Sequence, residues 1–205
     1  MSSAKTVKEL RDISGAGMMD CKKALEESNY DINKAMDILR KNGIAKAQKK
    51  AGRDAKDGII VPYIHPGAKL GVLVEINCET DFVARTDGFQ DFSRDIAMHI
   101  AATTPIAIKR EDVSEALISK EKEIYREQAL QTGKPDNIIE KMVEGRLNKF
   151  YQENVLLEQN FVKDPDKVIQ DLLNDTISTL GENIEIKRFS RFQLGESLKQ
   201  EKQTD

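Results

Sequence analysis

The sequence predicts an α+β fold in which a small domain of three helices precedes a larger α+β core. Two observations support this fold class. Apolar residues recur at helical spacing through residues 1–45, and after Gly58 the pattern changes to the two-residue period of β-strands. Helical patterns then return, and a last strand-like segment covers residues 184–189. The core, residues 59–195, should therefore hold a small, mostly antiparallel sheet packed on helices.

The N-terminal domain, residues 1–45, is expected to contain short amphipathic helices joined by brief turns. Thr6 can cap the first helix and Asp31 the third, because short polar side chains accept hydrogen bonds from free helix N–H groups. Gly15-Ala16-Gly17 separates the first two helices, and Gly43 suits the end of the third. The apolar set is small, so this domain should be only marginally stable.

A polar, helix-prone connector follows over residues 46–58, and residues 196–205 form a polar tail. The connector carries several basic residues, which could touch RNA. A solvated linker explains them better, because no aromatic side chain lies among them for base stacking. Its basic residues are Lys46, Lys49, Lys50, Arg53 and Lys56.

The core begins with a predicted hairpin of residues 59–64 and 70–76, and Pro62 places the first strand at a sheet edge. Four helices should follow. Asp87 could cap the first, the second covers residues 114–132, the third begins at Pro135, and the last runs from Asp164-Pro165 to residue 180.

The sequence offers no catalytic or metal-binding constellation. His65 lies in a turn and His99 in a helical pattern, and neither has a nucleophile beside it. Cys21 and Cys78 are isolated, and Gly15-Ala16-Gly17 lacks the strand and lysine of a phosphate loop. No cofactor or metal is expected, and an interaction protein is favoured over an enzyme.

Charge and hydropathy further limit the partners. The formal net charge is −3, which gives no overall attraction to nucleic acid. No apolar run approaches the ~20 residues that cross a bilayer, and no apolar signal core opens the chain. A cytoplasmic protein without a membrane partner is expected.

The segment Glu79–Arg85 lies between a predicted strand and a predicted helix. Glu79 and Asp81 could bind Mg²⁺ weakly, but Thr80 and Asp81 suit helix capping better. Phe82 either folds into the core or contacts a partner, and spacing alone favours the core.

A second ambiguous segment is Lys187–Phe192, where basic and aromatic residues alternate. This strand could stack RNA bases. A terminal strand with one apolar and one charged face has the same pattern and is commoner, so direct nucleic-acid binding is not expected.

Several motifs resemble the elongation factor Ts family, in order from residue 4 to residue 195. The opening Val7–Leu25 and the segment Asn77–Ala84 carry the most specific resemblance. Gly133-Lys134-Pro135, Lys141–Arg146 and Gly181–Ile184 fit the family as well.

The resemblance implies a guanine-nucleotide exchange factor for the GTPase elongation factor Tu, in its GDP-bound and nucleotide-free forms. In that family Thr80, Asp81, Phe82 and Val83 would enter a groove beside the partner's Mg²⁺. Phe82 would act as a wedge, and Asp81 would perturb the hydrogen bonds that hold the metal ligands.

The resemblance also implies a ubiquitin-associated-like N-terminal domain, which docks on the GTPase through Met18, Met19 and Asp20. Short members of the family can pair with a second copy through the C-terminal sheet. The alternative function, an RNA-binding accessory protein of translation, rests on the basic connector and on Lys187–Phe192.

Overall fold

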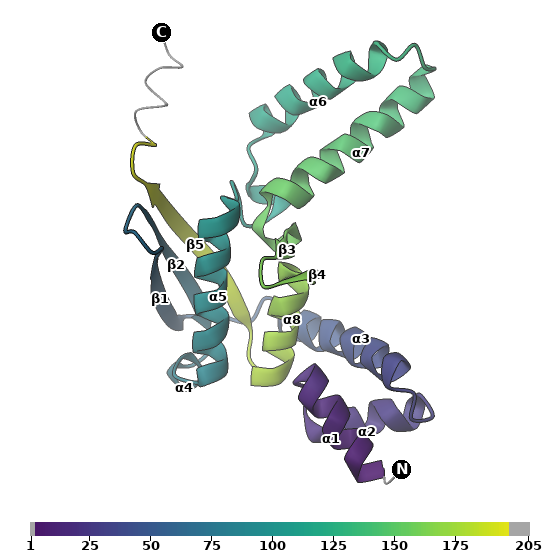
Figure 1. Ribbon diagram of the computed structural model, residues 1–205, viewed down its shortest axis with the longest axis vertical. Helices are drawn as coiled ribbons and strands as arrows, with labels where there is room; N and C mark the ends of the chain where they lie inside the picture. The colour runs from purple at the N-terminus through teal and green to yellow at the C-terminus, as the bar shows by residue number, and fades with distance from the viewer. Residues whose placement is uncertain (1–2, 197–205) are drawn as a thin grey trace. The chain divides into compact units, whose positions relative to one another are not determined.

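The computed structural model describes residues 3–196 and has the predicted α+β fold (Figure 1). Its helices are α1 (Ser3–Ser14), α2 (Met18–Glu27), α3 (Ile32–Lys50), α4 (Asp81–Ala84), α5 (Asp87–Thr103), α6 (Glu115–Leu130), α7 (Asp136–Asn154) and α8 (Ile169–Leu180). Its strands are β1 (Asp57–Ile64), β2 (Leu70–Cys78), β3 (Asn160–Phe161), β4 (Asp164–Val168) and β5 (Ile184–Gln193). Apart from Glu196, the predicted polar tail lies outside the described residues.

The described chain divides into two compact units, which share several elements. The first contains residues 3–61, 74–95 and 171–187, and the second contains residues 62–73, 96–170 and 188–196. Strands β1, β2 and β5 and helices α5 and α8 each contribute residues to both units.

Helices α1, α2 and α3 enclose a small apolar core, as predicted for the N-terminal domain. Leu10, Cys21 and Leu25 are fully buried there. Asp31 caps α3 as predicted, because its carboxylate accepts a hydrogen bond from the Lys34 N–H at 3.1 Å. The predicted Thr6 cap is wrong, since α1 begins at Ser3 and Thr6 lies inside it.

Helix α3 does not end at Gly43, where the sequence predicted its end. It continues through the predicted domain boundary at residue 45 and ends at Lys50. Gly43 is buried, and a Cβ atom there would lie 3.6 Å from Asp175 Oδ1 and 3.9 Å from Ser178 Cβ. This glycine therefore lets α8 approach α3 closely instead of ending the helix.

The main sheet has the strand order β1-β2-β5, so the prediction that Pro62 lies on an edge strand is confirmed. A short turn joins β1 to β2 as an antiparallel hairpin. Strand β5 also runs antiparallel to β2, because Leu194 at its end bonds Lys69 before β2, while Glu182 before β5 bonds Thr80 after β2. Alternate residues of β2 are buried, which gives the sheet one buried face.

One predicted helix cap and one predicted helix start are wrong. Helix α5 is capped by Thr86 and not by Asp87, since the Thr86 hydroxyl accepts a hydrogen bond from the Phe89 N–H at 3.3 Å. Residues 164–168 form strand β4, paired antiparallel with β3, and α8 starts only at Ile169. Asp164-Pro165 is typical of a helix start, but here this segment pairs with β3 instead.

Helices α6 and α7 form a hairpin in the second unit, with their long axes side by side (Figure 1). Ser114 caps α6 by accepting a hydrogen bond from the Leu117 N–H at 3.4 Å. Their contact contains the buried side chains of Ala129, Ile139 and Val143. The predicted pair of helices on either side of Gly133-Lys134-Pro135 is thus confirmed.

Candidate functional site

The candidate site is the segment between β2 and α5, residues 79–85, which we call the corner. Strand β2 ends at Cys78, and α4 begins at Asp81. Thr80 has extended backbone geometry, and its hydroxyl accepts a hydrogen bond from the Val83 N–H at 3.5 Å. The predicted helix cap at Thr80 is therefore confirmed.

Phe82 projects from this short helix into solvent. Its relative exposure is 78%, the highest among the large apolar residues of the described chain that lie at the surface, whereas Ala84 is buried. The expectation that Phe82 packs into the core is wrong, because the first turn of α4 directs the ring outward. Contact between Phe82 and a partner stays a prediction.

Asp81 and Arg85 form an ion pair one helical turn apart. The distance from Arg85 Nη2 to Asp81 Oδ2 is 2.7 Å; the Arg85 side chain is exposed and that of Asp81 is half-exposed. An exposed pair of this kind contributes little to stability. Either group can therefore exchange this contact for a partner's charged group at low cost.

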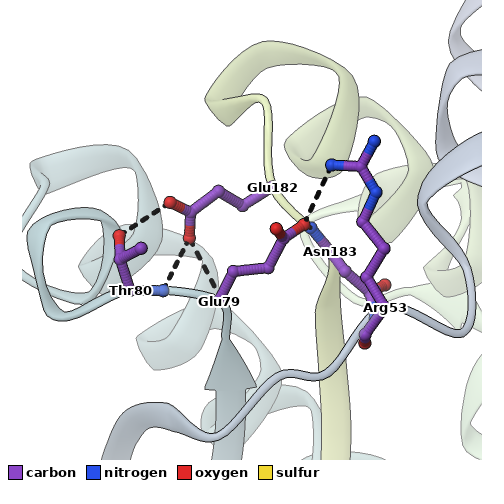
Figure 2. Close-up of polar contacts among 5 residues, drawn as sticks. All are labelled: Arg53, Glu79, Thr80, Glu182 and Asn183. Carbon is purple, nitrogen blue, oxygen red and sulfur yellow. Dashed lines mark hydrogen bonds and ion pairs between the residues drawn. The ribbon is translucent and has the colours of Figure 1, made fainter.

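The backbone of the corner is held from the segment between α8 and β5. Glu182 Oε2 accepts hydrogen bonds from the Glu79 N–H at 3.1 Å and from the Thr80 N–H at 3.0 Å. Glu182 Oε1 accepts one from the Thr80 hydroxyl at 2.7 Å. Figure 2 shows this carboxylate facing the start of the corner.

Glu79 makes the return contact. Its Oε1 accepts a hydrogen bond from the Asn183 N–H at 2.6 Å and lies 3.6 Å from Arg53 Nη1 (Figure 2). The Asn183 side-chain amide donates to the Arg53 carbonyl at 2.8 Å. Arg53 of the predicted connector therefore contacts both Glu79 and Asn183, next to the start of the corner.

Cys78 precedes the corner and is fully buried. Its thiol donates to the Thr80 carbonyl at 3.1 Å. Burial, with a smaller contribution from the Glu182 charge, raises the pKa of the Cys78 thiol from 9.0 to about 11. Cys78 is therefore a neutral thiol that packs under the corner, and it has no activated thiolate.

The second predicted group, Met18-Met19-Asp20, lies at the start of α2. Met18 and Met19 are 45% and 62% exposed, which leaves both side chains accessible. Asp20 is already paired, because Lys46 Nζ lies 2.7 Å from its Oδ2. The two methionines, more than the carboxylate, are thus available to a partner.

The other residues that the sequence offered as candidates form contacts within the chain. His99 is buried and bonds Gln159, whereas His65 is exposed in a turn beside Tyr63. Arg191 of the basic and aromatic strand bonds Gln193 and Glu196. No observation on this strand favours RNA binding.

Residues 3–196 lack two features that would suggest other functions. This part of the chain holds no group of three or more His, Cys, Asp or Glu side chains arranged for a metal ion. It also has no helix whose length and apolarity would suit a bilayer crossing.

Sequence patterns did not predict the contact between Glu182 and the corner. The residue belongs to a segment that fits the family resemblance, but its role depends on pairing with a segment 102 residues away. No local pattern of residues signals such a pairing.

Comparison with known proteins gives a consistent result. The family model described as "Elongation factor TS" matches residues 2–196. The chain is 61% identical to elongation factor Ts of Geobacter sulfurreducens over 203 residues, which cover 99% of this chain and 94% of the relative. It is 59% identical to that of Thermoanaerobacter sp. strain X514, with 97% of both chains covered. It is also 59% identical to that of Thermosipho melanesiensis, with 96% of this chain and 100% of the relative covered.

Proposed function

The chain belongs to the elongation factor Ts family and is a guanine-nucleotide exchange factor of elongation factor Tu, and we propose that the corner is the element through which it acts. Thr80, Asp81, Phe82 and Val83 enter the partner beside its Mg²⁺ and nucleotide. The chain supplies no cofactor and carries out no covalent step; it acts on the active site of another protein.

The observation that carries this proposal is that Phe82 is exposed, while Glu182 fixes the backbone just before it through hydrogen bonds. A large aromatic side chain left 78% exposed loses the stabilisation that burial would give it. A partner groove can supply that burial, which is about 1.5–3 kcal/mol for one phenylalanine. The binding energy of this contact is therefore available to deform the partner's metal site.

The proposed action follows from linkage between two binding equilibria. A factor that binds the nucleotide-free GTPase more tightly than the GDP-bound form must weaken GDP binding by the same factor. Mg²⁺ is the largest local positive charge facing the phosphates, so its displacement weakens GDP binding further. Asp81 would contribute by competing for the hydrogen bonds that hold the metal ligands.

The N-terminal domain docks on the same partner through Met18 and Met19, with Asp20 beside them. Exposed methionines suit this role because their flexible, polarisable side chains adapt to a partner surface. Met18→Ala and Met19→Ala together should raise the KM for the GTPase and leave the maximal rate of GDP release unchanged. A lower maximal rate with an unchanged KM would contradict a docking role.

The direct test of the exchange function uses elongation factor Tu loaded with a fluorescent GDP analogue and chased with excess unlabelled GDP. The chain should accelerate release catalytically, at concentrations below that of the GTPase. A pull-down with the chain should retain the GTPase, and added GDP should displace it. Unchanged release would refute the function.

A second copy of this chain is a further proposed partner. Exposed apolar side chains surround a hollow of about 600 Å³ between β2 and the end of β5. They are Ile64, Leu73, Phe192 and Leu194. Light scattering after size-exclusion chromatography should give a dimer mass, and Phe192→Asp should shift it to the monomer. A concentration-independent monomer mass for the wild-type chain would end this proposal.

A further inference from the structure

We propose that Glu182 is a positioning residue for exchange: its carboxylate fixes the backbone of the corner so that α4 presents Phe82 to the GTPase. This inference rests on the proposed function of the corner. Glu182 itself acts through Thr80 and Glu79, and its two carboxylate oxygens are occupied by them.

The three groups that meet at Glu182 are all hydrogen-bond donors, which favours a carboxylate at this position. Two backbone N–H groups reach one oxygen and the Thr80 hydroxyl reaches the other, at 3.1, 3.0 and 2.7 Å. An ionised carboxylate only accepts hydrogen bonds and has lone pairs for all three. Bonds to a charged acceptor are also roughly twice as strong as neutral ones. A glutamine could serve the two N–H groups, but its NH₂ would then face the hydroxyl.

The chain around Glu182 is shaped for this contact. Gly181 ends α8 with a φ of +84°, a conformation that other residues rarely adopt, and its N–H bonds the Ile177 carbonyl at 3.0 Å. The next residue thereby turns toward the corner. A reciprocal bond joins the same two segments, because the Glu79 carboxylate accepts a hydrogen bond from the Asn183 N–H at 2.6 Å.

The corner depends on this support because α4 is very short. A helix of four residues cannot hold its own geometry in water, since the first hydrogen-bonded turn is costly to form. Glu182 orders the Thr80 hydroxyl, which in turn accepts from Val83. Without Glu182, only a fraction of the molecules would hold Phe82 in its binding position. The apparent affinity for the GTPase is the intrinsic affinity multiplied by that fraction.

The test is a double-mutant cycle in the GDP-release assay. Glu182→Ala should lower kcat/KM about tenfold, which corresponds to a binding-competent fraction of roughly one tenth. Glu182→Gln should fall between this variant and the wild type. Glu144→Ala, an exposed glutamate of α7, is the matched control and should exchange normally. When Glu182→Ala is added to Phe82→Ala, kcat/KM should fall by less than about a further twofold, because both substitutions remove the same contact with the GTPase.

Hydrogen exchange at the Glu79 and Thr80 amides gives a readout that is independent of activity. Both amides should lose protection in Glu182→Ala, while protection in α5 and β2 is kept. If this variant does not fold, Glu182→Gln carries the same cycle. Fully additive losses in the double variant, or unchanged protection of the two amides, would overturn the inference.

Different results would refute the role of Phe82 in exchange and the role of Glu182 in positioning it. Wild-type exchange by Phe82→Ala would refute the proposed role of the corner. Slow exchange by Phe82→Ala together with wild-type exchange by Glu182→Ala would leave that role intact and remove only the positioning role of Glu182.

Discussion

Thr80 and Glu182 are joined by two hydrogen bonds, although 102 residues separate them in the sequence. The Thr80 N–H and hydroxyl donate to the two carboxylate oxygens at 3.0 and 2.7 Å. The same hydroxyl accepts from the Val83 N–H at 3.5 Å. One oxygen atom thus links the segment after α8 to the first turn of the helix that carries Phe82.

Thr80→Val keeps the shape of the side chain and removes this oxygen. Loss of the helix cap should lower the free energy of unfolding by about 1 kcal/mol, and GDP release should slow. Urea denaturation of the variant beside Thr80→Ser, which keeps a hydroxyl, measures the effect. Equal stability of the valine variant and the wild type would contradict the role of the hydroxyl.

Periodicity predicted the elements whose structure depends on local pattern. The β1–β2 hairpin and the helices on either side of Gly133 are examples, because their apolar spacing and caps lie within a few residues. Gly43 and Pro165 led to wrong helix boundaries, because a glycine in contact with α8 and a proline in a short strand have the same local pattern as a helix end and a helix start.

In the corner, too, local pattern predicted some features and not others. Spacing identified the Thr80 cap, but it favoured the wrong direction for Phe82, because an aromatic in a first helical turn can face either side. The family resemblance supplied the outward direction. The hydrogen bonds from Glu182 could not be predicted, since they depend on two distant segments meeting beyond the end of β2.

Gly58 in β1 should tolerate substitution poorly. It has a φ of +139°, and an added Cβ atom would overlap the Ile76 carbonyl oxygen and lie 2.7 Å from the Asn77 Cα. Gly58→Ala should destabilise the fold by about 2–4 kcal/mol, through strain and displacement of β2. Gly67→Ala is the matched control, because its φ is +93° but nothing lies within 4 Å of the added carbon. Equal losses in thermal melts would contradict the clash.

His99 should make the second unit sensitive to acid. Its Nδ1 accepts the Val162 N–H at 3.3 Å, so Nε2 carries the proton and donates to Gln159 Oε1 at 3.0 Å. Burial lowers the pKa of His99 below 6.5, so the unfolded chain binds a proton first as the pH falls.

The stability that neutral His99 contributes is therefore present above pH 6.5 and is lost as the pH falls through the folded pKa. Between pH 7.5 and pH 5.5, the wild type should lose more unfolding free energy than His99→Gln. Urea titrations of both proteins measure this difference. Parallel losses in the two proteins would contradict it.

The Cys78 thiol should resist alkylation. Because burial raises its pKa to about 11, the reactive thiolate is scarce at pH 8. Iodoacetamide labelling, read by mass spectrometry of the Cys78 peptide, should keep accelerating between pH 9 and pH 11. A rate that levels off at about pH 10, as for an ordinary thiol with a pKa of 9.0, would contradict the raised pKa. In urea the same cysteine should react at the rate of a free thiol.

The most direct test of the account is the rate of GDP release from elongation factor Tu in the presence of Phe82→Ala. Removing a contact of about 1.5–3 kcal/mol should slow release by roughly 10- to 100-fold, with an unchanged thermal melt because the ring is exposed. Leu130→Ala, which truncates another exposed apolar side chain, should release GDP at the wild-type rate. A wild-type rate for Phe82→Ala would contradict the central claim that the corner drives exchange.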